Sequence, residues 1–279
     1  MQGTFKRFYH PTLTRMSFLD KFLKPMMATA SPKEYQIKQL VKPIGLTQAP
    51  RKSTKYSQGN SLRDMFDSEK TNHRVKELAV EFSKSGLYDV QVFQKTKGKL
   101  FIAPVSYWKE DKALFFPHLI GTAMDDTKQQ NIEDMLRGKT SIVRLFSTAS
   151  GDKLSSSYFQ GIVDDNKKTD YLTEADARLS LNDSNVQIIE VNLVENAVKS
   201  ALVKTLARWA NRVPSWRQPF YFECSRGQWP FSVREELFCN NVFSGYVFLV
   251  DQQLKIRWAA CGEATPSEKE ALWKFAKCL

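Results

Sequence analysis

Apolar residues gather into two short runs in the middle of the chain. One run covers residues 141–146 and the other covers residues 186–191, with a long polar stretch between them. Runs of this length that are bounded by polar, turn-forming residues are typical of strands buried on both faces of a sheet. The pattern therefore predicts two buried strands joined by a long insertion.

A hairpin is predicted near the C-terminus. Residues 246–250 are apolar throughout, whereas residues 254–258 alternate apolar with basic side chains. Asp251 and the two glutamines after it form a short polar interruption of the kind that makes turns. The two stretches are therefore expected to pair as antiparallel strands.

Two amphipathic helices are predicted around this hairpin. In residues 198–213, the apolar side chains recur every three or four positions, and the basic residues Lys199, Lys204 and Arg208 lie largely off that stripe. Such a helix either packs on a sheet with a solvated basic face or lies on a membrane surface. At the end of the chain, Thr265 begins a second helix that has proline at its first position and glutamate at its third.

The order of these elements matches one known architecture. The predicted order is strand, insertion, strand, helix, antiparallel hairpin and helix. This order predicts an α/β, thioredoxin-like domain over residues 111–279, in which a mixed sheet is sandwiched by helices. Residues 61–110 are predicted to form a small N-terminal helix and hairpin extension. Its helix would end at Gly86, and its two strands would be residues 88–93 and 100–103.

Charge is distributed unevenly along the chain. The net charge is +11, but residues 1–60 contain eleven basic and two acidic side chains, so the other residues together carry only +2. Residues 1–30 are basic, poor in acids and potentially amphipathic, which is the composition of a mitochondrial transit peptide; a basic tail is the alternative. Residues 31–60 lack periodicity and are predicted to be a flexible basic linker. No apolar run approaches the ~18 residues of a membrane span.

Thiol chemistry is the first activity to consider for a thioredoxin-like order. Residues 147–155, where the first strand would meet its helix, contain no cysteine, and no pair among the four cysteines has Cys-x-x-Cys spacing. A thiol enzyme of the thioredoxin or peroxiredoxin type would have to use Cys261 or Cys224. It therefore remains an alternative hypothesis.

Other chemistry finds little support in the sequence. The three histidines are scattered, and residues 137–140 end like a phosphate-binding loop but have Glu133 where that loop needs glycine. We therefore predict no catalytic residue, no metal, no cofactor and no small-molecule substrate. Aromatic and arginine residues are plentiful and could stack on single-stranded RNA, so a mitochondrial RNA-binding protein is a further alternative hypothesis. The charge of only +2 on the body argues against nucleic acid as the partner.

Several motifs resemble the mitochondrial assembly factor family of the F-type ATP synthase that is known as ATPase complex subunit ten. The likeness is strongest in residues 241–251, which run into Lys255–Ala259 and Gly262. Weaker matches are Phe116-Pro117 with Leu119 and Gly121, residues 136–147, and Val191-Asn192. Together these motifs span about residues 110–279.

The resemblance implies an assembly chaperone that is not an enzyme. Members of this family are expected on the matrix side of the mitochondrial inner membrane as peripheral proteins, where they help to incorporate the hydrophobic subunit a (subunit six) into the Fo sector. The candidate client-binding or motif residues are Phe116, Pro117, Tyr246, Asp251, Arg257, Trp258, Lys199, Lys204 and Arg208. The motif residues could equally be fold determinants, with Gly245 and Gly262 giving backbone freedom and Asp251 making the turn.

Overall fold

The computed structural model describes residues 35–56, 87–126, 128–164, 167–183, 185–195 and 213–279. Within these ranges, the main sheet has eight strands in the order β3-β12-β11-β6-β9-β10-β4-β5. In the same order, their bounds are Leu114–Phe115, Lys255–Cys261, Tyr246–Val250, Thr140–Phe146, Val186–Val194, Tyr221–Ser225, Ile120–Ala123 and Gln129–Asn131.

Helices and two small strand pairs complete the described fold. The pairs are β1 (Lys38–Gln39) with β2 (Phe101–Ile102), and β7 (Ile162–Asp164) with β8 (Lys167–Thr169). The α-helices are α3 (Leu87–Thr96), α4 (Ile132–Leu136), α5 (Ala149–Ser156), α6 (Ala175–Asp183), α9 (Phe231–Glu236) and α10 (Pro266–Cys278). Two 3₁₀ turns are η2 (Gln218–Phe220) and η3 (Arg226–Gln228).

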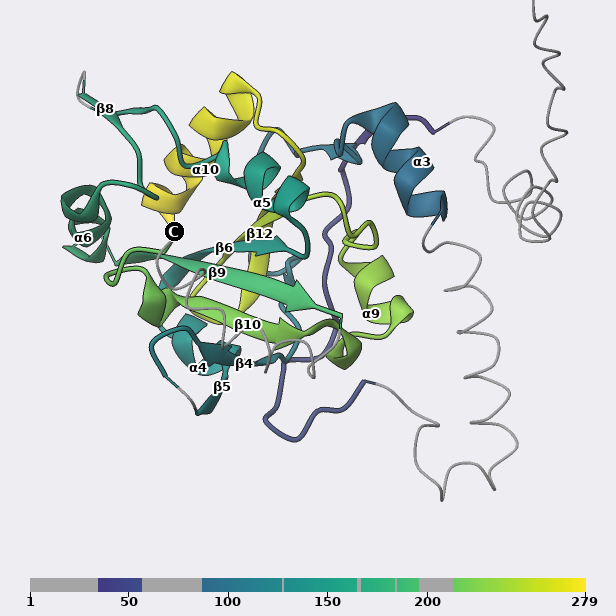
Figure 1. Ribbon diagram of the computed structural model, residues 1–279, viewed down its shortest axis with the longest axis horizontal. Coiled ribbons are helices and arrows are strands. Elements are labelled where there is room, and N and C mark those ends of the chain that lie inside the picture. Colours follow the sequence, from purple (N-terminus) through teal and green to yellow (C-terminus); the bar gives the residue numbers. More distant parts are fainter. Residues whose placement is uncertain (1–34, 57–86, 127, 165–166, 184, 196–212) are drawn as a thin grey trace, which may run out of the picture.

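The strand order confirms the predicted thioredoxin-like architecture. β6 and β9 are parallel neighbours, β11 runs antiparallel to β6, and β12 runs antiparallel to β11. Helix α5 follows the first of these strands and α10 follows the last. In Figure 1, α5 and α10 lie along one side of the central strands and α4 lies on the opposite side. The centre of the molecule is therefore a mixed sheet between layers of helix.

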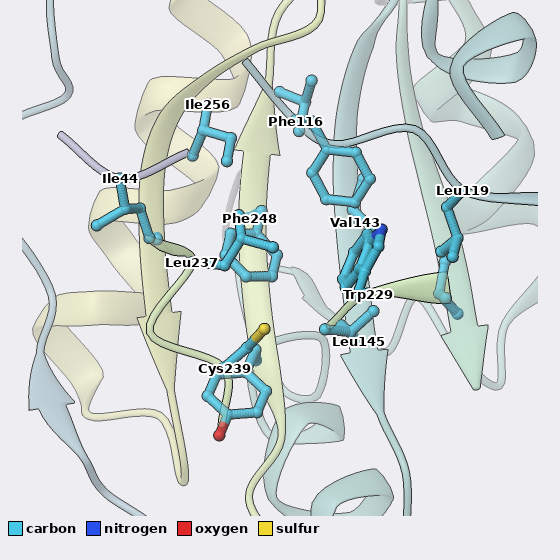
Figure 2. Close-up of a cluster of buried hydrophobic side chains, with 14 of the residues drawn as sticks. Ile44, Phe116, Leu119, Val143, Leu145, Trp229, Leu237, Cys239, Phe248 and Ile256 are labelled. Atoms are coloured by element: carbon cyan, nitrogen blue, oxygen red, sulfur yellow. The ribbon is translucent and has the colours of Figure 1, made fainter. Parts of the chain in front are cut away.

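Alternate residues of the central strands point into two different cores. On β11, Phe248 belongs to the core that α4 and α9 cover, and Leu249 belongs to the core that α10 covers. Figure 2 shows the first of these clusters, in which the ring of Phe116 packs edge-on against Trp229 and Phe248 with centroids 5.7 and 5.9 Å apart. Full burial of one such side chain contributes about 1.5–3 kcal/mol, so the two cores supply much of the driving force for folding.

The C-terminal hairpin and helix form as the sequence predicts. The turn is closed by Asp251, whose Oδ1 accepts the backbone N–H groups of Gln253 and Lys255 at 3.0 and 2.9 Å. At the start of α10, the Glu268 N–H donates to Thr265 Oγ1 at 3.2 Å, and the Thr265 N–H donates to Glu268 Oε2 at 3.1 Å. The reciprocal pair is the predicted capping box.

The predicted hairpin of residues 88–103 is wrong in its first strand. Residues 87–96 form helix α3, and β2 pairs in parallel with β1 instead. The buried positions Asp89, Val92 and Thr96 are spaced by three and four, which is a helical face that the alternating apolar residues concealed. Helix α3 is held by tertiary contact, since Asn241 Nδ2 donates to the carbonyl of Asp89 at 2.8 Å.

The linker prediction fails for the described part of residues 31–60. Residues 35–56 cross the body of the domain, where Leu40 and Ile44 are 6% and 2% exposed. Near the end of the segment, the hydroxyl of Tyr56 accepts the backbone N–H of His118 at 2.6 Å. A few apolar anchors thus fix a segment whose average composition is that of a linker.

Three other sequence predictions fall outside the described residues. They are the transit peptide of residues 1–30, the helix that would end at Gly86, and most of the helix of residues 198–213. None of the helices in the described ranges has both the length and the hydrophobicity needed to cross a bilayer.

Candidate functional site

The N-terminus of α5 lies where a thioredoxin-like fold would place its reactive thiols, directly after β6. Here the N-cap is Thr148, which accepts the Gly151 N–H at 3.3 Å and donates to the carbonyl of Val242 at 3.1 Å. Ser150 donates to the carbonyl of Phe243 at 2.9 Å. The two hydroxyl groups therefore bind α5 to the loop before β11. They occupy the positions at which a thiol enzyme would need a cysteine that is open to its substrate.

Two glycines, Gly151 and Gly245, allow α5 and the loop before β11 to come into close backbone contact. A Cβ atom on Gly151 would lie 2.5 Å from the carbonyl oxygen of Ser244, and one on Gly245 would overlap the carbonyl oxygen of Gly151. Gly245 is thus needed for close packing, which corrects the prediction that it provides backbone freedom. Gly262 does take a left-handed conformation, with φ +68°, as that prediction requires.

A buried cluster of charged side chains lies beside the same junction. Arg144 on β6 donates to Glu190 on the neighbouring β9 at 2.7 Å, and Arg217 donates to both carboxylate oxygens of Glu190 at 2.9 and 2.6 Å. Arg178 on α6 lies 3.5 Å from the same carboxylate, and Arg144 also pairs with Asp152 on α5. Glu190 therefore joins β6, β9, α6 and the segment that precedes β10.

Electrostatics keeps this carboxylate ionised. Burial alone would raise the pKa of Glu190, but the guanidinium groups of Arg144, Arg217 and Arg178 outweigh burial and lower it. Sequence reasoning missed the cluster. The signal was present, because Arg144 and Glu190 are charged residues inside the two apolar runs that predict buried strands. A charge at such a position needs a partner.

Three of the four thiols are buried. Cys224, Cys239 and Cys261 are enclosed by the fold, and Cys278 at the end of α10 is exposed. Burial raises the pKa of Cys261 to about 11 and that of Cys239 to about 12, and it also raises the pKa of Cys224. The sulfur of Cys261 accepts the backbone N–H of Leu100 at 3.1 Å. These thiols are therefore poor nucleophiles near neutral pH.

The hairpin residues predicted to bind a client lie inside the fold. Trp258 is 0% exposed and its indole N–H donates to the carbonyl of Pro104 at 2.9 Å. Arg257 pairs with Asp251 at 3.1 Å, and the hydroxyl of Tyr246 donates to the carbonyl of Asn241 at 2.9 Å. The prediction that Tyr246, Arg257 and Trp258 present a binding surface is therefore wrong. Their polar groups are used within the fold, as fold determinants would be.

The remaining candidates are two buried residues near α9 and three residues that the structure does not describe. Phe116 and Pro117 are buried under the α9 side of the sheet. Lys199, Lys204 and Arg208 lie outside the described residues, so their role in binding a client stays a prediction. In the described ranges, no group of three or more His, Cys, Asp or Glu side chains could hold a metal ion.

Two named relatives match this chain along all or nearly all of its length. It is 99% identical over 279 residues to the protein named mitochondrial ATPase complex subunit ATP10 in Saccharomyces cerevisiae, covering 100% of both chains. It is 48% identical to the protein of the same name in Candida glabrata, covering 94% of this chain and 92% of the other. Among solved structures, a thiol:disulfide interchange protein DsbE from Chlorobium tepidum matches 59% of this chain and 96% of its own, at 12% identity and a TM-score of 0.38.

A family model is also matched. The model described as ATP10 protein covers residues 24–279, a range that includes the segment from Tyr35 to Tyr56 as well as the sheet. The chain therefore belongs to the ATP10 protein family.

Proposed function

We propose that this chain is an assembly chaperone for the mitochondrial F-type ATP synthase and that it helps to incorporate subunit a (subunit six) into the Fo sector. The observation that carries the proposal is family membership over almost the whole chain, with relatives named as mitochondrial ATPase complex subunits. Its place of action would be the matrix side of the inner membrane, to which it would bind as a peripheral protein after removal of a transit peptide.

The geometry supports a role without catalysis. In the described part of the chain, hydroxyl groups and a glycine contact close the junction between α5 and the loop before β11. Three thiols are buried with raised pKa values, which weakens the alternative of a thiol enzyme that uses Cys261 or Cys224. The fold would then serve as a rigid scaffold that presents a binding surface to its client.

The test is an assembly assay in mitochondria that lack the protein. Newly synthesised subunit a is labelled, and its incorporation into Fo is followed by native electrophoresis in the presence and absence of this chain. The proposal expects labelled subunit a to accumulate outside the complex, or to be degraded, unless the chain is restored. Full incorporation of subunit a without the chain would overturn it.

A second arm separates the chaperone from a thiol enzyme. A variant with Cys224, Cys239 and Cys261 replaced by alanine and Cys278 replaced by serine is compared with the wild type after circular dichroism has shown that it folds. Restored assembly by this variant is expected of a chaperone. A folded variant that cannot restore assembly would favour thiol chemistry.

A further inference from the structure

A groove opens between helix α10 and the small hairpin of β7 and β8. Its volume is about 540 Å³. Ile162 and Val163 form one wall, Tyr171 and Trp273 form the floor, and Lys269 and Lys274 of α10 form the opposite rim. The groove is of the size that proteins use to bind small molecules or side chains of a partner.

The floor is held rigidly in place. The ring of Tyr171 stacks on Trp273 with centroids 4.2 Å apart and an interplanar angle of 20°, and Phe159 packs edge-on against the same indole at 6.1 Å. The indole N–H of Trp273 donates to the carbonyl of Tyr158 at 2.9 Å. Because the two rings hold each other by stacking and the indole is also hydrogen-bonded, the floor is formed without an occupant, which lowers the entropic cost of binding.

The rim carries positive charge. Lys269 is positioned by a hydrogen bond from its ammonium group to the carbonyl of Gln160 at 3.0 Å, and Lys274 lies just over one turn further along α10. The side chain of Lys168 on β8 packs over Gly161, which also lines the groove. Glu270 is the one acid among the described lining residues. In a body whose net charge after residue 60 is only +2, this rim is a local concentration of lysine.

Apolar surface is exposed at the edge of the groove. Val163 is 71% exposed, whereas Trp273 and Tyr171 are 5% and 4% exposed. The aromatic floor is therefore recessed, and Val163 is the one large hydrophobic side chain that is strongly exposed among the described lining residues, whereas insertion into a bilayer needs several such side chains. A recessed floor fits a side chain that enters from a partner, and the lysine rim fits carboxylates beside that side chain.

We infer that this groove binds an acidic segment of a protein partner, with one aliphatic or aromatic side chain seated on Trp273 and neighbouring carboxylates paired with Lys269 and Lys274. The inference rests on the proposed function, because it takes the client of assembly as the protein that supplies the segment. The binding mode would be a peptide anchored by one side chain and selected by charge.

The experiment uses site-specific photocrosslinking in intact mitochondria. Full-length chain with benzoylphenylalanine in place of Val163 is imported into mitochondria that lack the endogenous protein, and the crosslinked peptide is sequenced by mass spectrometry. We expect one segment in which at least two Asp or Glu residues flank a Leu, Phe, Tyr or Trp. Crosslinking only to phospholipid, only to segments without acids, or to nothing would overturn the inference.

Charge reversal provides the matched comparison. The double variant Lys269→Glu with Lys274→Glu should lower the crosslink yield about tenfold, because each carboxylate of the partner then meets a like charge. The control Lys109→Glu with Lys112→Glu changes the net charge equally at two exposed lysines outside the groove and should leave the yield unchanged. Equal yields from the two double variants would contradict the inference.

A second variant, Val163→Asp, controls for loss of folding, because it alters a side chain that is mostly exposed. Since position 163 is then occupied, benzoylphenylalanine replaces Glu270 both in this variant and in the chain that keeps Val163. The crosslink yield of Val163→Asp should be lower than that of the chain with Val163, with the melting temperature unchanged. The experiment also separates failure of the proposed function from failure of the groove inference. If only the proposed function fails, subunit a assembles without this chain, but the groove still crosslinks to an acidic segment of another protein.

Discussion

Arg144 and Glu190 lie directly opposite each other on the parallel strands β6 and β9, and 2.7 Å separates Nη1 from Oε2. Both side chains are almost wholly shielded from solvent, at 1% and 0% exposure. The pair stands between the sheet and the helices on one face, where Arg217 and Arg178 complete the shell around the carboxylate. The carboxylate of Glu190 thus links β6, β9, α6 and the segment before β10, while Asp152 pairs with Arg144 from α5.

Removing that charge should destabilise the protein strongly. Glu190→Gln leaves three guanidinium groups around a neutral amide, and breaking a buried ion pair from one side typically costs about 3–5 kcal/mol. Chemical denaturation that is monitored by tryptophan fluorescence measures the loss. The control is Glu263→Gln at an exposed position, which should change the free energy of unfolding by less than about 0.5 kcal/mol. Equal stability of the two variants would contradict the structural role of Glu190.

The contribution of Glu190 should depend on pH. The guanidinium groups lower its pKa in the folded state below the ordinary value of 4.5, so the unfolded state binds a proton first as the pH falls. The stability that the carboxylate provides is therefore complete above about pH 4.5 and is lost as the pH falls through the lower pKa of the folded state. We expect the difference in unfolding free energy between wild type and Glu190→Gln to be constant from pH 6 to 8 and to shrink below about pH 4.5.

The glycine contact at the start of α5 should tolerate no side chain. Gly245→Ala places a methyl group against the carbonyl oxygen of Gly151 and within 2.8 Å of Ser155 Cβ, so the loop before β11 must move away from α5. Overpacking of this kind costs about 1–3 kcal/mol. The matched control is Gly227→Ala, where a new Cβ would meet nothing nearer than Ser225 Oγ at 3.6 Å. Thermal unfolding should show a lower melting temperature for Gly245→Ala alone.

The helix cap of α10 offers a graded test. Thr265→Ala removes the hydroxyl that accepts the Glu268 N–H and should cost about 1 kcal/mol. Glu268→Ala should cost more, because this carboxylate also accepts the Ala103 N–H at 3.1 Å and pairs with Lys99. Urea denaturation of the two variants gives the order directly. A larger loss from Thr265→Ala than from Glu268→Ala would show that the long-range contacts of Glu268 contribute little.

Thiol labelling should separate the four cysteines. At pH 7.5, iodoacetamide should modify Cys278 rapidly in the folded protein and leave Cys224, Cys239 and Cys261 unmodified, because burial blocks access and raises their pKa values. In denaturant all four should react. Mass spectrometry counts the alkyl groups over time, and fast labelling of Cys261 in the folded state would revive the thiol-enzyme alternative.

Local sequence patterns determined the central elements of this protein. The apolar runs predicted β6 and β9, the alternation after Asp251 predicted the hairpin of β11 and β12, and Thr265 with Glu268 predicted the start of α10. These features succeed because each depends on residues a few positions apart: the burial of a strand, the geometry of a turn, or the backbone donors at a helix end. The thioredoxin-like order followed from them.

Only the tertiary structure decided what lies far apart in sequence. Val92 turned an alternating segment into a helix because it packs into the core, and Leu40 and Ile44 anchored a segment with the composition of a linker. Trp258, which was predicted to lie on a binding surface, is buried, and its indole N–H donates to the carbonyl of Pro104. The partners of Glu190 come from three separate parts of the chain, and the groove on Trp273 exists because Tyr171 packs against α10. Such contacts depend on how distant segments pack in the folded chain, so the local pattern of hydrophobic residues does not predict them.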